Sequence, residues 1–245
     1  GLIFFSSVID RRSVDLLDSL DVLMFKVASA DLPNTELLEH LATKCKPIIL
    51  STGMATKIEI DQAVKAVSKF RTCDLVLLHC VSAYPTPLEG VHLRKIQSLR
   101  ERYSLPVGFS DHTEGWVAAI LAIGLGCCVF EKHFTLDRTT HGPDHKMSME
   151  PKQFKSYGDL IRSGYTALGS GRLTFTDLEA VVREEYRCSI VARYQIPKGE
   201  IITDEMIAYR RPSGGLEPYE RNQIIGKKAI NNISENQYIL LKDVD

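Results

Sequence analysis

The sequence predicts an α/β fold class, with a parallel sheet built from repeated strand–helix units and then a small, mostly β domain. Two observations predict it. Short apolar runs recur at 2–8, 23–29, 47–52, 75–82, 106–110 and 128–134, and their starts lie 21, 24, 28, 31 and 22 residues apart. Each interval has room for one helix and two loops, which is the alternation of a parallel sheet. After residue 169 the pattern changes to short strands and turns.

Helical signals follow four of the apolar runs. Residues 34–44 start at Asn34, a good N-cap, and residues 56–69 open with the capping-box pair Thr56 and Glu59. Residues 113–125 start at Thr113 and continue as an apolar helix, and a last helix is expected over 151–168. These helices would cover the sheet and connect its parallel strands.

The domain boundaries follow from composition. We expect an incomplete, barrel-like (β/α) domain over 1–170, a linker over 171–187 and a small β domain over 188–245. The linker contains the flexible GSGR and the charged TFTDLEAVVREEYR, for which we expect irregular structure. Six strand–helix units are too few for a closed (β/α)₈ barrel, which has eight and about 250 residues. The repeat therefore leaves two interpretations, an open doubly wound sheet or a barrel lacking two units.

Bulk composition excludes several classes of partner. The 245 residues are 44% hydrophobic and 25% charged, with a net charge of −1, so we expect neither a nucleic-acid nor a membrane partner. The six cysteines include no C-x-x-C pair, and we expect a reduced, cytoplasmic protein. Gly1 stands where an initiator Met is usual, and we expect that it is not the natural start.

Polar side chains follow every apolar run, at the edge where parallel β/α proteins bind ligands. Any single serine or threonine there can simply satisfy a turn or cap a helix. The convergence of six such ends indicates a site for a small polar ligand. The six ends carry Ser6, Ser7 and Asp10; Lys26, Ser29 and Asp31; Ser51, Thr52 and Gly53; His79, Ser82 and Tyr84; Ser110, Asp111 and His112; and Glu131, Lys132 and His133.

His112 and His133 come from consecutive strand ends and are expected to be neighbours. Two imidazoles facing one pocket can bind a divalent metal and leave positions open for substrate and water. Asp111 and Glu131 stand beside them as candidates for a base or for a hydrogen-bond partner of the imidazoles. Spacing alone leaves metal binding and plain hydrogen bonding as open interpretations of the histidine pair.

Lys26 and Lys132 admit two chemical roles. A desolvated lysine in a β/α barrel can form a Schiff base with a carbonyl substrate, or it can neutralise a phosphate. Strand alternation places Lys132 on the face opposite Glu131 and His133, so we expect it to pack or pair behind the site.

A set of ordered motifs resembles the bacterial N-acetylneuraminate (sialic acid) synthase family. The motifs are FKVASAD (25–31), KPIILSTGMAT (46–56), LLHCVSAYPTP (77–87), VGFSDHT (107–113), EKHFTLD (131–137) and GPDHKMSMEP (142–151). GEIITDEMIAYRRPSGG (199–215) and IIGKKA (224–229) resemble the family's C-terminal type III antifreeze-like (SAF-type) domain. The resemblance implies a (β/α)₈ TIM-type barrel that here lacks its first two βα units, followed by the antifreeze-like domain.

The implied reaction condenses phosphoenolpyruvate with N-acetylmannosamine to give N-acetylneuraminate and phosphate, with C–O cleavage. The implied cofactor is a divalent metal, Mn²⁺, Mg²⁺ or Co²⁺, on His112 and His133, which would polarise the sugar aldehyde. Glu131 is the candidate for orienting or deprotonating the attacking water. The motifs discriminate poorly among sugars, so legionaminate and pseudaminate synthases are alternatives.

The resemblance also assigns ligand contacts position by position. Ser7, Lys26, Ser29 and Ser110 match positions that hold the phosphate and carboxylate of phosphoenolpyruvate, and Ser82 and Tyr84 match positions near the ligands. Asp144 matches a position close to the sugar hydroxyls, with a catalytic role. Arg211 matches an arginine that reaches the sugar's N-acetyl group from the partner chain of a domain-swapped homodimer. From the residues alone, a Schiff-base aldolase and a non-catalytic fragment are further hypotheses.

Overall fold

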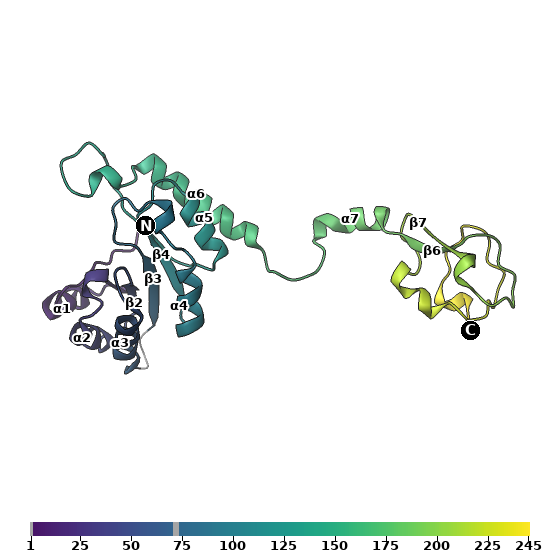
Figure 1. Cartoon of the computed structure of the whole chain (residues 1–245), viewed down its shortest axis with the longest axis horizontal. Coiled ribbons are helices and arrows are strands. Elements are labelled where there is room, and N and C mark those ends of the chain that lie inside the picture. The colour runs from purple at the N-terminus through teal and green to yellow at the C-terminus, as the bar shows by residue number, and fades with distance from the viewer. Residues whose placement is uncertain (1, 71–73) are drawn as a thin grey trace. The chain divides into compact units, whose positions relative to one another are not determined.

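The computed structural model describes residues 2–70 and 74–245, which form two compact units, Gly1–Ser170 and Gly171–Asp245. In the first unit, strands and helices alternate (Figure 1). The strands are β1 (Phe25–Val27), β2 (Ile48–Ser51), β3 (Leu75–Cys80), β4 (Val107–Asp111) and β5 (Phe130–Lys132), and the helices are α1 (Arg11–Ser19), α2 (Thr35–Ala42), α3 (Lys57–Ser68), α4 (Lys95–Tyr103), α5 (Val117–Gly124) and α6 (Pro151–Leu168).

All five strands are parallel and lie in the order of the chain, β1-β2-β3-β4-β5. This sequential order is that of a TIM-type barrel, whereas a doubly wound sheet reverses direction at a switch point. The five strand–helix units form an incomplete (β/α) barrel, so the barrel interpretation of the repeat is confirmed.

The helices begin where capping chemistry allows. Asn34 accepts from Leu37 N at 3.1 Å and starts α2, and Thr56 and Glu59 form the predicted capping box of α3. The helix predicted over 151–168 is present with those bounds, with Pro151 at its first turn. The helix predicted over 113–125 is shorter in the structure, and α5 begins only at Val117. Thr113 instead forms a β-bridge with Thr86, and its backbone N donates to Asp111.

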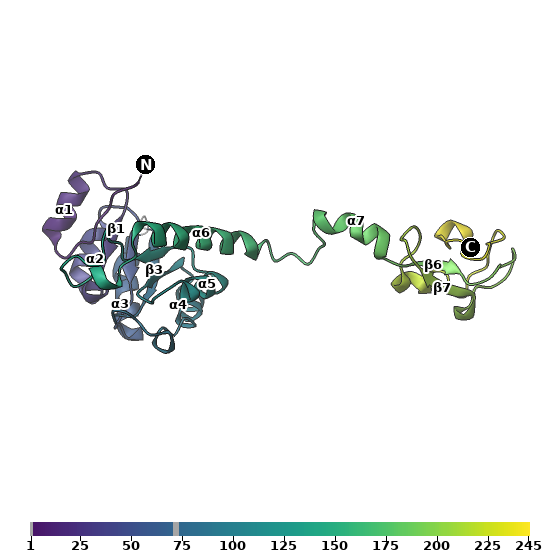
Figure 2. The ribbon, with the colours of Figure 1, turned by 90° about the horizontal axis from the view of Figure 1, so that it is seen from above.

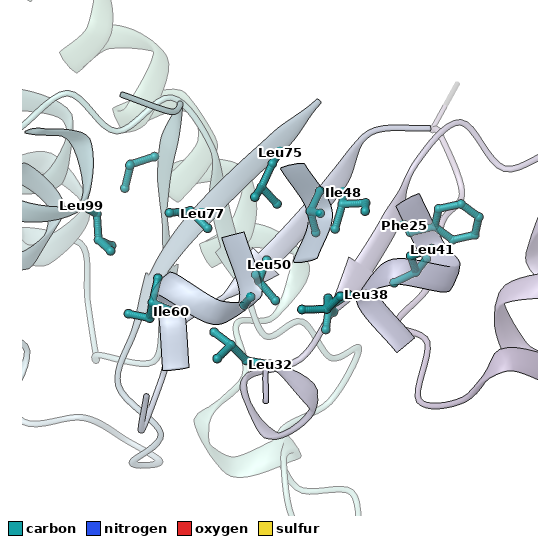
Figure 3. Close-up of a cluster of buried hydrophobic side chains, with 14 of the residues drawn as sticks. Phe25, Leu32, Leu38, Leu41, Ile48, Leu50, Ile60, Leu75, Leu77 and Leu99 are labelled. Carbon is teal, nitrogen blue, oxygen red and sulfur yellow. The ribbon is translucent and has the colours of Figure 1, made fainter. Parts of the chain in front are cut away.

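A continuous apolar core fills the space between the sheet and its helices. Figure 3 shows Phe25, Ile48, Leu50, Leu75 and Leu77 of the strands facing Leu38, Leu41, Ile60 and Leu99 of the helices. Alternate residues of each strand therefore point outward to the helices. The intervening residues point to the inner face, where Lys26, Ser110 and Glu131 lie. Figure 2 shows α6 alongside α5, and a smaller cluster of Ala119, Met149 and Tyr157 lies at that contact.

The prediction of a strand over residues 2–8 is wrong. Only Ser7 bridges to Lys26, with Val8 N donating to Lys26 O at 3.0 Å and Lys26 N to Ser6 O at 3.2 Å. Leu2, Ile3 and Phe4 are exposed. An apolar run becomes a strand only where a neighbour satisfies its backbone, and within the described residues that neighbour is limited to β1. Helices α1 and α4 were not predicted, because their surfaces are strongly polar.

The second unit is small and mostly β, as predicted. Strands β6 (Ser189–Ala192) and β7 (Ile207–Arg210) pair antiparallel, and four further bridges tie the loops together. Its core is a cluster of isoleucines, among them Ile190, Ile196, Ile202, Ile224, Ile233 and Ile239.

The expectation of irregular structure in the charged segment before the β strands is wrong. Residues Asp177–Tyr186 form helix α7. Thr176 and Glu179 cap it, and Arg183 pairs with Glu217 at 2.6 Å. The Arg183–Glu217 ion pair joins α7 to the β part of the second unit, to which the helix belongs. Across residues 2–70 and 74–245, every helix is too short or too polar to cross a bilayer.

Candidate active site

Lys26 projects from β1 onto the inner face and is 7% exposed. Its Nζ donates to Ser51 Oγ at 2.8 Å and to Val27 O at 2.9 Å, and it lies 3.6 Å from Glu131 Oε2. Burial lowers the pKa of the Lys26 ammonium, and the Glu131 carboxylate opposes part of that shift. A buried cation with a single, partly exposed carboxylate partner is a suitable place for a second anion.

Glu131 of β5 is held by two partners on the inner face. Ser110 Oγ donates to Glu131 Oε1 at 2.7 Å, and Lys26 lies beside Oε2. Ser110 and Glu131 are register partners across β4 and β5, so sheet pairing itself brings them together. About two fifths of the Glu131 side chain is exposed, which leaves the carboxylate accessible to water or substrate.

Ser29 and Ser82 meet around a glycine at the carboxyl edge of the sheet. Gly53 N donates to Ser29 Oγ at 3.0 Å. A Cβ on Gly53 would lie 2.6 Å from Ser82 Oγ, 2.7 Å from Ser29 Oγ and 3.2 Å from Cys80 Sγ. Only glycine fits without displacing these hydroxyls. The loops after β1, β2 and β3 thus converge as the resemblance implies.

His112 and His133 are neighbours, as predicted from their strand ends. Their ring centroids lie 5.2 Å apart with a 63° interplanar angle. The Tyr84 ring lies tilted by 44° against His112 at 4.3 Å and meets His133 edge-on at 5.8 Å. Burial and the neighbouring His112 lower the pKa of His133, although Asp144 and Glu131 oppose the shift. The His133 imidazole is therefore neutral at pH 7, with a lone pair available.

The donor chemistry of this pair fits a divalent cation. His112 Nδ1 lies 2.8 Å from Val81 O, and because a carbonyl only accepts, Nδ1 is the donor of this bond and Nε2 is the nitrogen left to bind a cation. Imidazole nitrogens are common ligands of divalent transition-metal ions. Among residues 2–70 and 74–245, no group of three or more His, Cys, Asp and Glu side chains is arranged to hold a metal. The structure thus brings together two nitrogen donors.

Three further residues predicted for the site, Asp144, Ser7 and Arg211, have different surroundings. Asp144 Oδ2 is 3.9 Å from His133 Nδ1, so the loop before α6 reaches the histidine pair. Ser7 is exposed beside Lys26 in the bridge between the chain start and β1. Arg211 belongs to the second unit, where it is exposed and its guanidinium lies 5.7 Å from the Tyr186 ring.

Asp111 and Lys132 lie on the opposite face of the sheet. Lys132 Nζ is 3.2 Å from Asp111 Oδ2, and both side chains are almost fully buried under α6. The expectation that Lys132 pairs behind the site is confirmed. The expectation that Asp111 serves as a base or imidazole partner is wrong, because strand alternation directs it outward while His112 turns inward. A Schiff base on Lys132 is excluded by the same geometry.

The cavity with a volume of about 430 Å³ is elsewhere, between α3 and α4 on the helix side of the sheet. It is lined by Ile60, Leu99 and Arg102, among others, and by Thr52 and His79 of the predicted polar strand ends. None of the residues that were assigned a catalytic, ligand or metal role lines it. His79 Nε2 donates to Val91 O at 2.7 Å, so this histidine is a satisfied residue of the outer layer.

Two inner-face residues were assigned no individual role from the sequence, although Ser51 was among the predicted polar strand ends. Ser51 accepts from Lys26, and Cys80 is the register partner of Ser110 and lies beside Gly53. Both follow from alternation within β2 and β3, a signal that could have found them.

Comparisons with known proteins agree with this architecture. The model of the NeuB family matches residues 1–173, and that of the SAF domain matches residues 187–245. N,N'-diacetyllegionaminic acid synthase of Legionella pneumophila is 39% identical over 249 residues, covering 100% of this chain and 70% of that protein. Pseudaminic acid synthase of Campylobacter jejuni is 36% identical over 233 residues, covering 95% and 68%.

A solved structure shows the same fold. The crystal structure of N-acetylneuraminic acid synthetase from Leptospira borgpetersenii matches with a TM-score of 0.70 and 35% sequence identity, covering 74% of this chain and 63% of that one. The ordered strand ends, the histidine pair and both matching regions lead to one assignment. This chain belongs to the NeuB family and carries a C-terminal SAF, or antifreeze-like, domain.

Proposed function

We propose that this protein is a synthase that condenses phosphoenolpyruvate with N-acetylmannosamine, or a related N-acetylated sugar, to give a nonulosonic acid and phosphate. The observation that carries the proposal is the inner-face row of Lys26, Ser110 and Glu131 beside His112 and His133. A buried cation, a carboxylate and two imidazoles on one face match the needs of an anionic three-carbon donor and an aldehyde acceptor. The named relatives support the class of reaction.

The surroundings of Lys26 suit phosphoenolpyruvate, the three-carbon donor of the reaction. The Lys26 ammonium would neutralise the phosphate or carboxylate of phosphoenolpyruvate, and the hydroxyls of Ser29 and Ser82 would donate to the same oxygens. Ser110, which holds Glu131, would border these oxygens. The C3 carbon of the donor forms a bond to the sugar aldehyde carbon. Water then adds at C2, and the C2–O bond to phosphate breaks. Atoms balance as donor, sugar and water against sugar acid and phosphate.

We assign to Glu131 the activation of the water that adds at C2. Its carboxylate lies between Ser110 and Lys26, with one side exposed, and would orient water and accept its proton. A divalent cation on His112 and His133 would supply Lewis-acid polarisation of the aldehyde oxygen. Tyr84 and Asp144 border the imidazoles and would position the sugar hydroxyls. Arg211 would contact the N-acetyl group from the partner chain of a domain-swapped dimer in the cytoplasm.

The direct test measures phosphate release from phosphoenolpyruvate with N-acetylmannosamine, and separately with a di-N-acetylated 6-deoxy sugar. Donor carrying ¹⁸O in the bridging position should yield ¹⁸O-labelled phosphate, because the C–O bond breaks. Chelator should abolish turnover and Mn²⁺ should restore it. Turnover that persists in chelator, or unchanged activity in His112→Ala, would remove the metal from the proposal. Absence of phosphate release with every sugar would instead favour a non-catalytic role.

A Schiff-base aldolase is a second candidate, favoured by the lowered pKa of buried Lys26. Borohydride reduction with pyruvate distinguishes the two functions. A covalent adduct that is lost in Lys26→Arg would support the aldolase, and no adduct is expected for the synthase.

A further inference from the structure

We propose that Asp111, Lys132 and Tyr157 form a buried positioning network that aligns His112 and His133 from behind the sheet. The inference rests on the proposed use of the two imidazoles, and it assigns a function to groups outside the reacting site. None of the three side chains faces the inner row.

The Asp111 carboxylate is satisfied on both oxygens. Oδ1 accepts from Thr113 N at 2.8 Å and from Thr113 Oγ1 at 2.7 Å. Oδ2 accepts from the Tyr157 hydroxyl at 2.9 Å and lies 3.2 Å from Lys132 Nζ. Lys132 Nζ also donates to Thr113 O at 2.5 Å. Five charge-assisted contacts therefore converge on Asp111 and Thr113, the two residues that flank His112 in the chain.

This arrangement restrains both histidines through the backbone. Asp111 and Lys132 are register partners across β4 and β5, so their ion pair clamps the two strands at the last paired position. His112 follows Asp111 and is closed in by Thr113, while His133 follows Lys132. A shift of either strand by a fraction of its rise would break the clamp and move one imidazole relative to the other.

Tyr157 extends the network into α6. It is 3% exposed and packs with Ala119 and Met149, and Met149 N donates to His133 O at 2.9 Å. Tyr157 of α6 therefore contacts Asp111, which precedes His112, and Met149, whose backbone bonds to His133. Buried ion pairs can often be replaced by uncharged groups of similar volume without loss of stability. Stability alone therefore gives a weak reason for burying charge directly behind the two histidines.

The test uses three variants of the full chain. The double variant Asp111→Asn/Lys132→Met removes both charges and leaves no single buried ion. Tyr157→Phe removes one hydroxyl and keeps the ring. Tyr103→Phe is the matched control, because its hydroxyl also donates to an aspartate, Asp61 at 2.7 Å, but on the α3–α4 side. Circular dichroism and thermal unfolding confirm folding in each case.

Two measurements report positioning. In metal-free protein, ¹⁵N imidazole shifts and exchange of the His112 Nδ1–H report its bond to Val81 O. Electron paramagnetic resonance titration gives the affinity for Mn²⁺, and calorimetry gives that for phosphoenolpyruvate. The double variant should lose Mn²⁺ affinity by about 10-fold or more, as loss of supporting contacts typically does. Its His112 signals should shift, and phosphoenolpyruvate affinity at Lys26 should be unchanged.

Tyr157→Phe should change the same signals in the same direction by less, and Tyr103→Phe should leave them unchanged. A folded double variant with native His112 signals and native Mn²⁺ affinity would overturn the inference. Should the double variant fail to fold, native signals in Tyr157→Phe would overturn it. If wild-type Mn²⁺ binding were insensitive to His112→Ala, the proposed function would lose its metal, while the metal-free imidazole signals would still decide the positioning role.

Discussion

The Lys26 ammonium of β1 lies 3.6 Å from the Glu131 carboxylate of β5, although these are the first and last strands of the sheet. Neighbouring strands are about 4.8 Å apart, so a flat sheet would separate the first and fifth by about 19 Å. The ion pair forms because the sheet is strongly curled around its inner face. Curvature therefore creates the candidate site from residues that are distant both in sequence and in strand order.

Replacing Glu131 with Gln should reduce the turnover number by about 10²–10⁴-fold, the range expected for loss of a general base. The amide keeps the shape and can still accept from Ser110, so affinity for phosphoenolpyruvate should change little. Phosphate-release kinetics and calorimetry measure the two quantities. Glu101→Gln on α4 is the control and should behave as wild type. Equal activity of Glu131→Gln and wild type would contradict the role.

Divalent cation binding should depend on pH through His133. Its folded pKa lies below the ordinary imidazole value of 6.5 because of burial and the adjacent His112. A cation competes with the proton, so affinity for Mn²⁺ should stay constant above that value and fall only as pH drops through the lowered pKa. A Mn²⁺ titration at several pH values checks this. A midpoint above 6.5 would contradict the lowered pKa.

Gly53→Ala should damage both stability and substrate binding. The new Cβ would meet the Ser29 and Ser82 hydroxyls at 2.7 and 2.6 Å, and relieving such overpacking typically costs about 1–3 kcal/mol. The Michaelis constant for phosphoenolpyruvate should rise because both hydroxyls move. Gly124→Ala is the matched control, since no atom lies within 4 Å of its added Cβ. Chemical denaturation and kinetics distinguish the variants, and a native Michaelis constant in Gly53→Ala would refute the contact.

Asp61 should account for part of the acid sensitivity of the fold. Arg102 donates to it at 2.8 and 2.7 Å and Tyr103 at 2.7 Å, and these bonds hold the pKa of the carboxyl well below its usual range. A carboxyl with a depressed folded pKa stabilises the protein above its unfolded pKa, about 3.9, and that stabilisation is lost as pH falls further. Asp61→Asn should be less stable at pH 7 and should unfold with a weaker pH dependence below about pH 4. Asp159→Asn, which removes exposed pairs within α6, should change unfolding less.

The proposed domain swap predicts complementation between inactive variants. Arg211→Ala and Glu131→Gln should each be inactive or strongly impaired alone. If Arg211 acts on the partner's site, a mixed dimer contains one site with both native residues, and activity should return after the two variants are unfolded and refolded together. If Arg211 acts within its own chain, every site in the mixture lacks one residue and activity stays low.

Much of the fold could be predicted because strand–helix alternation and capping are local. The spacing of apolar runs located β1 to β5, and Asn34, Thr56 and Glu59 located the starts of two helices. The failures have a common cause. Residues 2–8 have the composition of a strand but pair with β1 only through the Ser7–Lys26 bridge. Residues 177–186 are so rich in charge that no apolar helical pattern stands out, although they form a capped helix. Pairing and packing decide such segments.

The sequence by itself determined which side chains stand at the strand ends, because period-2 alternation and strand order are encoded locally. It therefore predicted the approach of His112 to His133 and the outward turn of Lys132. Only the tertiary structure decided that Lys26 reaches Glu131 and that Asp111 faces Lys132 and Tyr157 under α6. The first contact depends on how far the sheet curls. The second depends on where α6 packs, and Tyr157 of that helix follows Asp111 by 46 positions. Neither is a property of any short segment.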